Sequence, residues 1–220
     1  MVQAAGIQSA GRQGREEAFS IWRRESLDLL ISDVRLNGGS GIDLARRLKA
    51  VPEPSPLVVF VTGYADLSNE EAYDVGACAI LNKPINRGDL VRAVERFLRP
   101  LCDRWATPVE VQPKEHLRRH FASLESALTQ REFSFGRGGI FVRGSESACE
   151  FLPIRFEFSF DEGPMLRMDG CGISRWQRIV PLPSLPAGTG IEIVHIDDHA
   201  RQRITELISS MNTKAFIPKA

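Results

Sequence analysis

The sequence has no excess of charge of either sign and no long apolar run. Its 28 Lys and Arg residues balance 28 Asp and Glu residues, so no basic surface favours nucleic acid or an anionic membrane. No apolar run is long enough to span a bilayer, and the first residues lack the basic and apolar regions of a signal peptide. We therefore expect a cytoplasmic protein with no membrane insertion and no nucleic-acid partner.

Metal-binding and catalytic motifs are also lacking. The four cysteines (Cys78, Cys102, Cys149 and Cys171) lie far apart, which predicts neither a disulfide framework nor a zinc site and fits a reducing compartment. The histidines show no ligand spacing, and none lies in a catalytic motif. A basic recognition helix for DNA is missing as well. We expect that the chain is not an enzyme.

Three short apolar runs in the first half each end on, or lead directly to, a residue with a reactive or charged side chain. They cover residues 27–33, 56–62 and 77–84. Such runs, alternating with helical patterns, predict parallel strands buried on both faces, and ligands of such sheets bind at the carboxyl ends of the strands. Asp33, Thr62 and Lys83 should therefore converge, where their carboxylate, hydroxyl and ammonium groups can hold a phosphoryl group.

The order and spacing of these residues resemble the receiver domain of bacterial response regulators. The match includes Ser-Asp-Val-Arg-Leu at residues 32–36 and Asn-Lys-Pro at residues 82–84. The resemblance implies a doubly wound α/β fold with a flavodoxin-like parallel sheet over residues 1–99. It also implies Asp33 as phosphoacceptor, Thr62 as the hydroxyl that follows the phosphoryl group, Lys83 as its counter-charge, and a sensor histidine kinase as partner.

The resemblance also shows what this sequence omits. A receiver begins with a strand that ends in two acidic residues, followed by a helix, and neither precedes the strand predicted at residues 2–9. Of the family's magnesium ligands, only Asp33 and the backbone carbonyl of Arg35 remain, so we expect magnesium to bind weakly or not at all. Ile80 stands where receivers commonly carry an aromatic residue. The chain either has a truncated start or completes its sheet in another way.

The second half changes from helical to alternating patterns. Residues 100–114 are predicted to be a linker, and residues 114–128 a helix with apolar residues at helical spacing (Leu117, Phe121, Leu124 and Leu128). Residues 154–160 alternate apolar and polar side chains, and residues 165–176 and 190–196 continue as strands. A helix over residues 199–211 closes the chain. These elements predict a small antiparallel β-barrel.

Residues 138–143, 170–176 and 188–196 resemble the PilZ domain, and the match covers residues 115–217. PilZ domains that bind cyclic di-GMP use an Arg-x-x-x-Arg segment and an Asp/Asn-x-Ser-x-x-Gly segment. This half has no Arg-x-x-x-Arg, and Ser-Phe-Gly-Arg-Gly-Gly at residues 134–139 departs from the second segment. The candidate nucleotide ligands are Arg131, Ser134, Arg137 and Gly139. We predict that cyclic di-GMP binds no better than GMP.

These observations predict a two-component signalling adaptor. Phosphorylation of Asp33 would alter the receiver, and the PilZ-like domain would pass the change to a downstream protein by direct contact. Two alternatives stay open: a degenerate receiver and PilZ scaffold that only presents binding surfaces, and a receptor for cyclic di-GMP.

Overall fold

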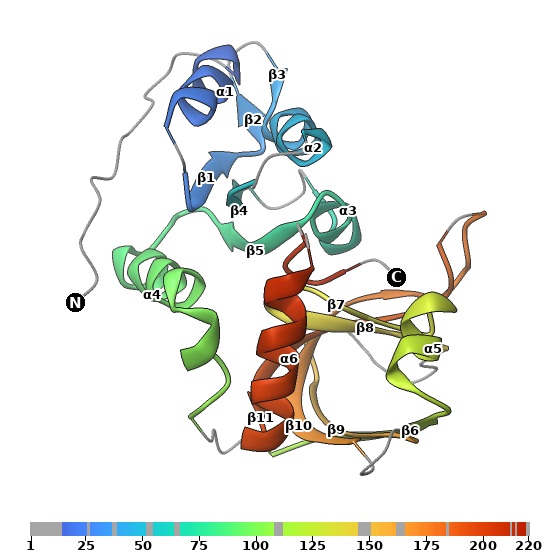
Figure 1. The fold of residues 1–220 in the computed structure, drawn as a ribbon. Helices are drawn as coiled ribbons and strands as arrows, with labels where there is room; N and C mark the ends of the chain where they lie inside the picture. The colour runs from blue at the N-terminus through green and yellow to red at the C-terminus, as the bar shows by residue number, and fades with distance from the viewer. Residues whose placement is uncertain are drawn as a thin grey trace.

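The computed structural model of the chain forms two lobes that follow one another in sequence (Figure 1). It describes residues 15–25, 27–36, 39–51, 55–63, 67–107, 112–144, 151–161, 166–183, 185–211, 213 and 215–218. The strand predicted at residues 2–9 lies outside the described residues. No helix within these ranges combines the length and the apolarity needed to cross a membrane.

The N-terminal lobe alternates helices with the three strands of a small parallel sheet. Its elements are α1 (Arg15–Arg24), β1 (Leu29–Asp33), β2 (Arg35–Leu36), β3 (Gly39–Ser40), α2 (Gly41–Ala50), β4 (Leu57–Thr62), α3 (Asn69–Asp74), β5 (Ala77–Asn82) and α4 (Arg87–Leu98). The sheet has the order β1-β4-β5, and both pairs of strands are parallel. In the described part of the lobe, β1 is an edge strand.

Both faces of this sheet are covered, as continuous apolar runs predict. All six residues of β4 are buried. Val58 and Phe60 pack with residues of α2 and α3, whereas Leu57 and Val59 pack on the opposite face, beside α4. On α4, Phe97 is buried, whereas Leu98 remains 37% exposed.

The C-terminal lobe is a curled sheet covered by short helices (Figure 1). Its elements are η1 (Leu101–Asp103), β6 (Glu115–Phe121), α5 (Leu124–Thr129), β7 (Phe133–Phe135), β8 (Gly139–Arg143), β9 (Pro153–Phe160), β10 (Leu166–Arg178), β11 (Gly188–Ile196) and α6 (Asp198–Ser210). The strand order is β6-β9-β10-β11-β8-β7, with β6 and β9 parallel and the other pairs antiparallel. The result is a half-barrel rather than a closed antiparallel barrel.

The helix predicted over residues 114–128 is wrong in its first half. Residues Glu115–Phe121 form β6, which pairs with β9 in the register Leu117↔Phe156 and Phe121↔Phe160, and only Leu124–Thr129 is helical. The misleading signal was the spacing of four between Leu117 and Phe121. Residues four apart share one face of a helix, but they also share one face of a strand. Pairing with β9 decides between the two structures.

Candidate functional site

The residues predicted to hold a phosphoryl group lie at one edge of the parallel sheet. Asp33 ends β1, Thr62 ends β4, and Lys83 directly follows β5. Asp33 is in register with Val61, and the Lys83 N–H donates a hydrogen bond to the carbonyl of Thr62 at 2.8 Å. The backbone of the sheet therefore places all three residues at the carboxyl ends of neighbouring strands.

Asp33 and Lys83 are in direct contact. The Lys83 ammonium group donates to Asp33 Oδ2, and the backbone N–H of Arg35 donates to Asp33 Oδ1 at 3.2 Å. The hydrogen bond from Lys83 holds the pKa of Asp33 below its ordinary value of 3.8, and the bond from Arg35 acts in the same direction against the opposing effect of burial. Both side chains remain accessible, with exposed fractions of 33% for Asp33 and 49% for Lys83. The site thus presents an ionised, reachable carboxylate beside a positive charge.

Thr62 is the third predicted residue, and it is buried. Its hydroxyl donates a hydrogen bond to the carbonyl of Gly63 at 2.9 Å. The hydroxyl therefore lies on the strand between those that carry Asp33 and Lys83, and a change of side-chain rotamer would free it to donate to another acceptor.

The turn after Asp33 is packed closely against the start of α2. The Gly41 N–H donates to the carbonyl of Val34, and a Cβ added at Gly41 would lie 2.1 Å from the carbonyl oxygen of Asp33. Only glycine leaves room for this approach. Ser40 caps α2 by accepting a hydrogen bond from the Ile42 N–H. The backbone beside Asp33 is therefore fixed on both sides.

The donors at this edge do not amount to a magnesium site. Mg²⁺ demands octahedral oxygen coordination, commonly from one or two carboxylates together with phosphate and water oxygens. Asp33 supplies one carboxylate here, and Arg35 could add its backbone carbonyl. Within the residues that the structure describes, no cluster of three His, Cys, Asp or Glu side chains could hold a metal ion. These residues do not fit the ion as a complete donor set.

The opposite side of the lobe is joined to the C-terminal lobe by charged side chains. Glu192 on β11 is only 2% exposed, and it accepts from Arg175 Nε at 2.7 Å and also contacts Arg96 on α4. Arg178 on β10 donates to Asp74 Oδ1 at the end of α3 at 3.2 Å. Burial lowers the pKa of Arg175 and brings that of Arg96 to about 10. Both arginines are charged at neutral pH, so they neutralise the buried carboxylate.

An apolar cluster lies between the lobes beside these charges. From the N-terminal lobe it includes Tyr73, Cys78 and Phe97, together with Leu57 and Val59 of β4. The C-terminal lobe contributes four side chains to the same cluster: Phe141, Trp176, Phe216 and Ile217. We call these nine residues the shared core.

The end of the chain takes part in the shared core. The N–H groups of Arg137 and Gly138 donate to the carbonyls of Ala215 and Phe216. These bonds hold the Phe216 ring against that of Phe97, with the ring centroids 5.1 Å apart. The segment at residues 215–218 therefore lies between the two lobes, near the C label in Figure 1.

The candidate nucleotide ligands of the second half lie along the segment that carries β7 and the start of β8. Arg131 precedes β7, Ser134 lies within β7, and Gly139 begins β8, where a Cβ would lie 2.3 Å from the carbonyl oxygen of Ile191. Arg137 Nη2 donates to the carbonyl of Ser55 in the N-terminal lobe at 3.2 Å. Arg137 and Gly139 therefore serve packing and lobe contact in this structure.

Comparisons with known proteins agree with the geometry of the first half. Residues 1–95 match the response regulator receiver domain family. The sensory transduction protein LytT of Bacillus subtilis is 32% identical over 109 residues, which cover 50% of this chain and 43% of LytT. The response regulator protein PilR of Pseudomonas aeruginosa is 35% identical over 85 residues, which cover 38% of this chain and 19% of PilR.

A solved CheY-like response regulator receiver domain protein from Methanospirillum hungatei is 29% identical, with a TM-score of 0.33; the match covers 37% of this chain and 65% of that one. The chain spans less than half the length of LytT and of PilR. The N-terminal part of this chain is a response regulator receiver domain with the flavodoxin-like fold that the resemblance implied.

The sequence alone did not reveal the residues that join the lobes. Glu192 lies in the apolar strand Gly-Ile-Glu-Ile-Val, where a carboxylate is expected to need a buried partner. That was the one available signal, and it does not identify Arg96 or Arg175 as the partners. A charged residue in the middle of an apolar strand thus indicates a buried ion pair but not the residue that completes it.

Proposed function

We propose that this chain is a response regulator whose Asp33 accepts a phosphoryl group, and whose C-terminal lobe passes the change to a downstream protein by contact. The observation that carries the proposal is the exposed Asp33 carboxylate in contact with Lys83, at the strand ends of a domain that matches the receiver family. A sensor histidine kinase would be the physiological donor. The chain itself would not be an enzyme beyond assisting its own phosphorylation.

The reaction proposed for Asp33 is a simple transfer. A carboxylate oxygen of Asp33 forms a bond to phosphorus while the bond between phosphorus and the donor breaks, and the donor group leaves. The lowered pKa keeps the carboxylate ionised and able to attack at neutral pH. Lys83 must give up part of its contact with Asp33 and can then pair with the phosphoryl oxygens. Thr62 can turn its hydroxyl to the same oxygens.

The path from this site to the C-terminal lobe runs along elements that reach both. Lys83 follows β5, which carries Cys78 of the shared core, and Thr62 ends β4, which carries Leu57 and Val59 of that core. A shift of the strand ends would therefore act directly on packing between the lobes. We propose that this packing is the element that phosphorylation changes.

We further propose that the C-terminal half-barrel is a PilZ-like output domain that acts on a protein and not through cyclic di-GMP. The engagement of Arg137 with the carbonyl of Ser55 supports this assignment, because that guanidinium group already has a role between the lobes. The alternative of a phosphorylation-independent scaffold draws support from the magnesium donor set, which is incomplete among the residues that the structure describes. The two functions differ in whether Asp33 is modified.

The test is phosphorylation of the full chain by acetyl phosphate with magnesium, followed by intact-mass spectrometry. We expect slow addition of one phosphoryl group, because the metal donors are few, and complete loss of the adduct in Asp33→Asn. Asp43→Asn, which removes a carboxylate from the first turn of α2, is the matched control and should be modified like the wild type. An adduct that persists in Asp33→Asn, or no adduct in the wild type, would favour the scaffold.

A further inference from the structure

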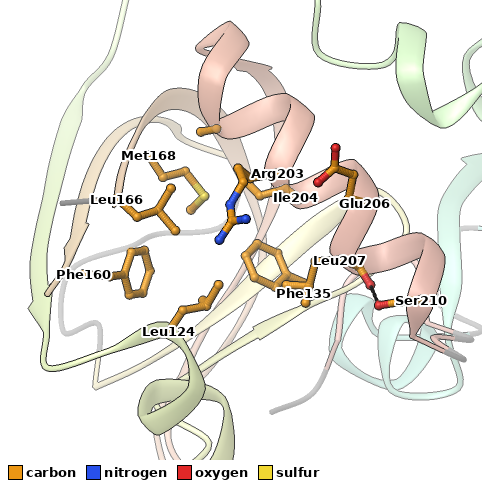
Figure 2. A pocket seen from close by; sticks show the side chains of 11 residues that line it. Leu124, Phe135, Phe160, Leu166, Met168, Arg203, Ile204, Glu206, Leu207 and Ser210 are labelled. Atoms are coloured by element: carbon orange, nitrogen blue, oxygen red, sulfur yellow. Dashed lines mark hydrogen bonds between the residues drawn. The ribbon is translucent and has the colours of Figure 1, made fainter. Parts of the chain in front are cut away.

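A pocket of about 270 Å³ lies in the C-terminal lobe, well away from the phosphoacceptor edge. It opens between α6 and the inner face of the curled sheet, next to α5, as Figure 2 shows. None of its lining residues belongs to the receiver domain or to the shared core. The proposed phosphorylation does not use this pocket.

The body of the pocket is apolar. Phe135, Phe160, Leu166 and Met168 come from β7, β9 and β10, and each is less than 8% exposed. Ala200, Ile204 and Leu207 of α6, together with Leu124 of α5, complete the apolar lining. Walls of this kind bind hydrocarbon or aromatic groups by removing their surface from water. The volume lies just below the range of roughly 300–1,000 Å³ that holds drug-sized ligands, so the occupant should be small.

One cation is directed into this apolar space. Arg203 lies on α6 one turn after Ala200 and next to Ile204, so it shares the edge of the buried face of the helix. Arg203 remains exposed to solvent, and its guanidinium group is directed toward the pocket that Phe135 and Phe160 line (Figure 2).

No hydrogen bond or ion pair joins the side chain of Arg203 to any other residue that the structure describes. Two neighbouring groups on α6 have partners of their own: Arg201 pairs with Asp198 at 2.6 Å, and Glu206 accepts from Gln202 at 3.5 Å. Figure 2 shows the carboxylate of Glu206 directed away from the guanidinium group. The donors of Arg203 are thus available to a ligand at the edge of a mainly apolar pocket.

We propose that this pocket binds a small monocarboxylate whose apolar body fills the space between the sheet and α6, and whose carboxylate pairs with Arg203. A guanidinium group offers two parallel donors that match the two oxygens of a carboxylate. Two polar residues, Glu206 and Ser210, also line the pocket, but the Glu206 carboxylate accepts from Gln202 and the Ser210 hydroxyl donates to the carbonyl of Leu207. The proposal is independent of phosphorylation at Asp33 and gives the C-terminal lobe a ligand of its own.

The experiment titrates the full chain with octanoate, with 1-octanol, which keeps the apolar body and lacks the charge, and with acetate, which keeps the charge and lacks the body. Calorimetry gives the affinity, and the NMR signal of the Met168 methyl group reports occupation of the pocket. We expect octanoate to bind more tightly than either of the other two and to shift the Met168 signal. Absence of octanoate binding, or equal affinity for octanoate and octanol, would overturn the proposal.

Two variants separate the proposed contact from general charge effects. Arg203→Met keeps the apolar stem but removes the charge. The affinity for octanoate should fall by at least about tenfold, as expected for a lost hydrogen bond to a charged group. The affinity for octanol should stay unchanged. Arg167→Met removes the same charge from the strand position between Leu166 and Met168, whose side chain points to the other face of β10, and should leave both affinities unchanged. An unchanged octanoate affinity in Arg203→Met, or an equal loss in Arg167→Met, would contradict the assignment.

Discussion

The two lobes differ in how their cores are closed. The C-terminal lobe has a core of its own, in which rings from neighbouring strands pack together (Phe121, Phe133, Phe135, Phe156, Phe158 and Phe160). The N-terminal lobe has a three-stranded sheet, and only one of its faces is covered mainly by its own helices. The other face is completed by Phe141, Trp176, Phe216 and Ile217 of the C-terminal lobe.

This difference implies that the receiver domain depends on the C-terminal lobe for its stability more than the C-terminal lobe depends on the receiver domain. Loss of the receiver domain would expose one side of the C-terminal lobe but would leave its aromatic core in place. Loss of the C-terminal lobe would expose Leu57, Val59 and Phe97, which belong to the small core of the receiver domain. A small domain has little core to spare, so the receiver domain should be the less stable partner. A signalling domain of low stability is well suited to change its packing after a small chemical event.

The largest expected effect follows from removing a ring of the aromatic core. Phe158 is 1% exposed, and its ring centroid lies 5.3 Å from those of Phe133 and Phe156. Phe158→Ala should lower the free energy of unfolding by about 3–5 kcal/mol. If the receiver domain depends on the C-terminal lobe, hydrogen exchange should accelerate in β1, β4 and β5 as well as in β9 and β10. Urea unfolding and hydrogen-exchange mass spectrometry measure the two effects.

Phe60→Ala is the matched control in the receiver domain, because Phe60 is also fully buried. It should cost a similar free energy but accelerate exchange only in β1, β4 and β5, leaving β9 and β10 protected. Equal loss of protection in both lobes for both variants would show that the chain unfolds as one unit, and the one-way dependence would then be wrong.

The next effect tests the charges between the lobes. In Glu192→Gln, Arg175 and Arg96 lose the carboxylate that neutralises them. Removing one partner of a buried ion pair lowers the free energy of unfolding by about 3–5 kcal/mol. Because Arg96 is half-exposed and can turn to water, we expect Glu192→Gln to lower it by about 2 kcal/mol. Glu157→Gln is the control, since Glu157 pairs with Arg118 on the outer side of the same sheet and should cost less than about 1 kcal/mol.

The reactivity of Cys78 reports whether loss of the Glu192 carboxylate opens the contact between the two lobes. The thiol is buried in the shared core, and burial raises its pKa to about 11, so it should react very slowly with alkylating agents in the folded chain. With the other three cysteines replaced by serine, Cys78 should be alkylated faster in the Glu192→Gln variant than in the Glu157→Gln variant at equal denaturant concentration. Equal labelling rates would show that the ion pairs do not hold the lobes together.

Much of the receiver domain could be predicted from sequence because its information is local. Each strand is a continuous apolar run, Ser40 and Ser68 cap the helices that follow them, and Gly76 has a φ of +85° where it ends the segment after α3. The convergence of Asp33 with Lys83 follows from strand order alone, since parallel strands bring their carboxyl ends to one edge.

The parts that could not be predicted depend on contacts between distant segments. Leu117 and Phe121 fit a helix and a strand equally well, and pairing with β9 decides. Glu192 gives no sign in the sequence that its partners are Arg96 and Arg175. Arg203 is a surface residue of an amphipathic helix by pattern, and only the fold shows an apolar pocket beneath it.

The smallest effect concerns the edge of the parallel sheet that carries Asp33 and Lys83. Lys83 lowers the pKa of Asp33 in the folded chain, so the pair stabilises the fold above the ordinary pKa of 3.8, and this contribution is lost as the pH falls through the lowered value. Both groups are solvated, so Lys83→Met should cost less than about 1 kcal/mol at neutral pH and nothing in acid. A carboxyl NMR titration should show the Asp33 pKa rising toward 3.8 in Lys83→Met, whereas Lys114→Met, which removes an exposed charge elsewhere, should leave it unchanged. An Asp33 pKa that does not respond to Lys83→Met would mean that the contact does not tune the carboxylate, and the edge would then resemble the rest of the solvated surface.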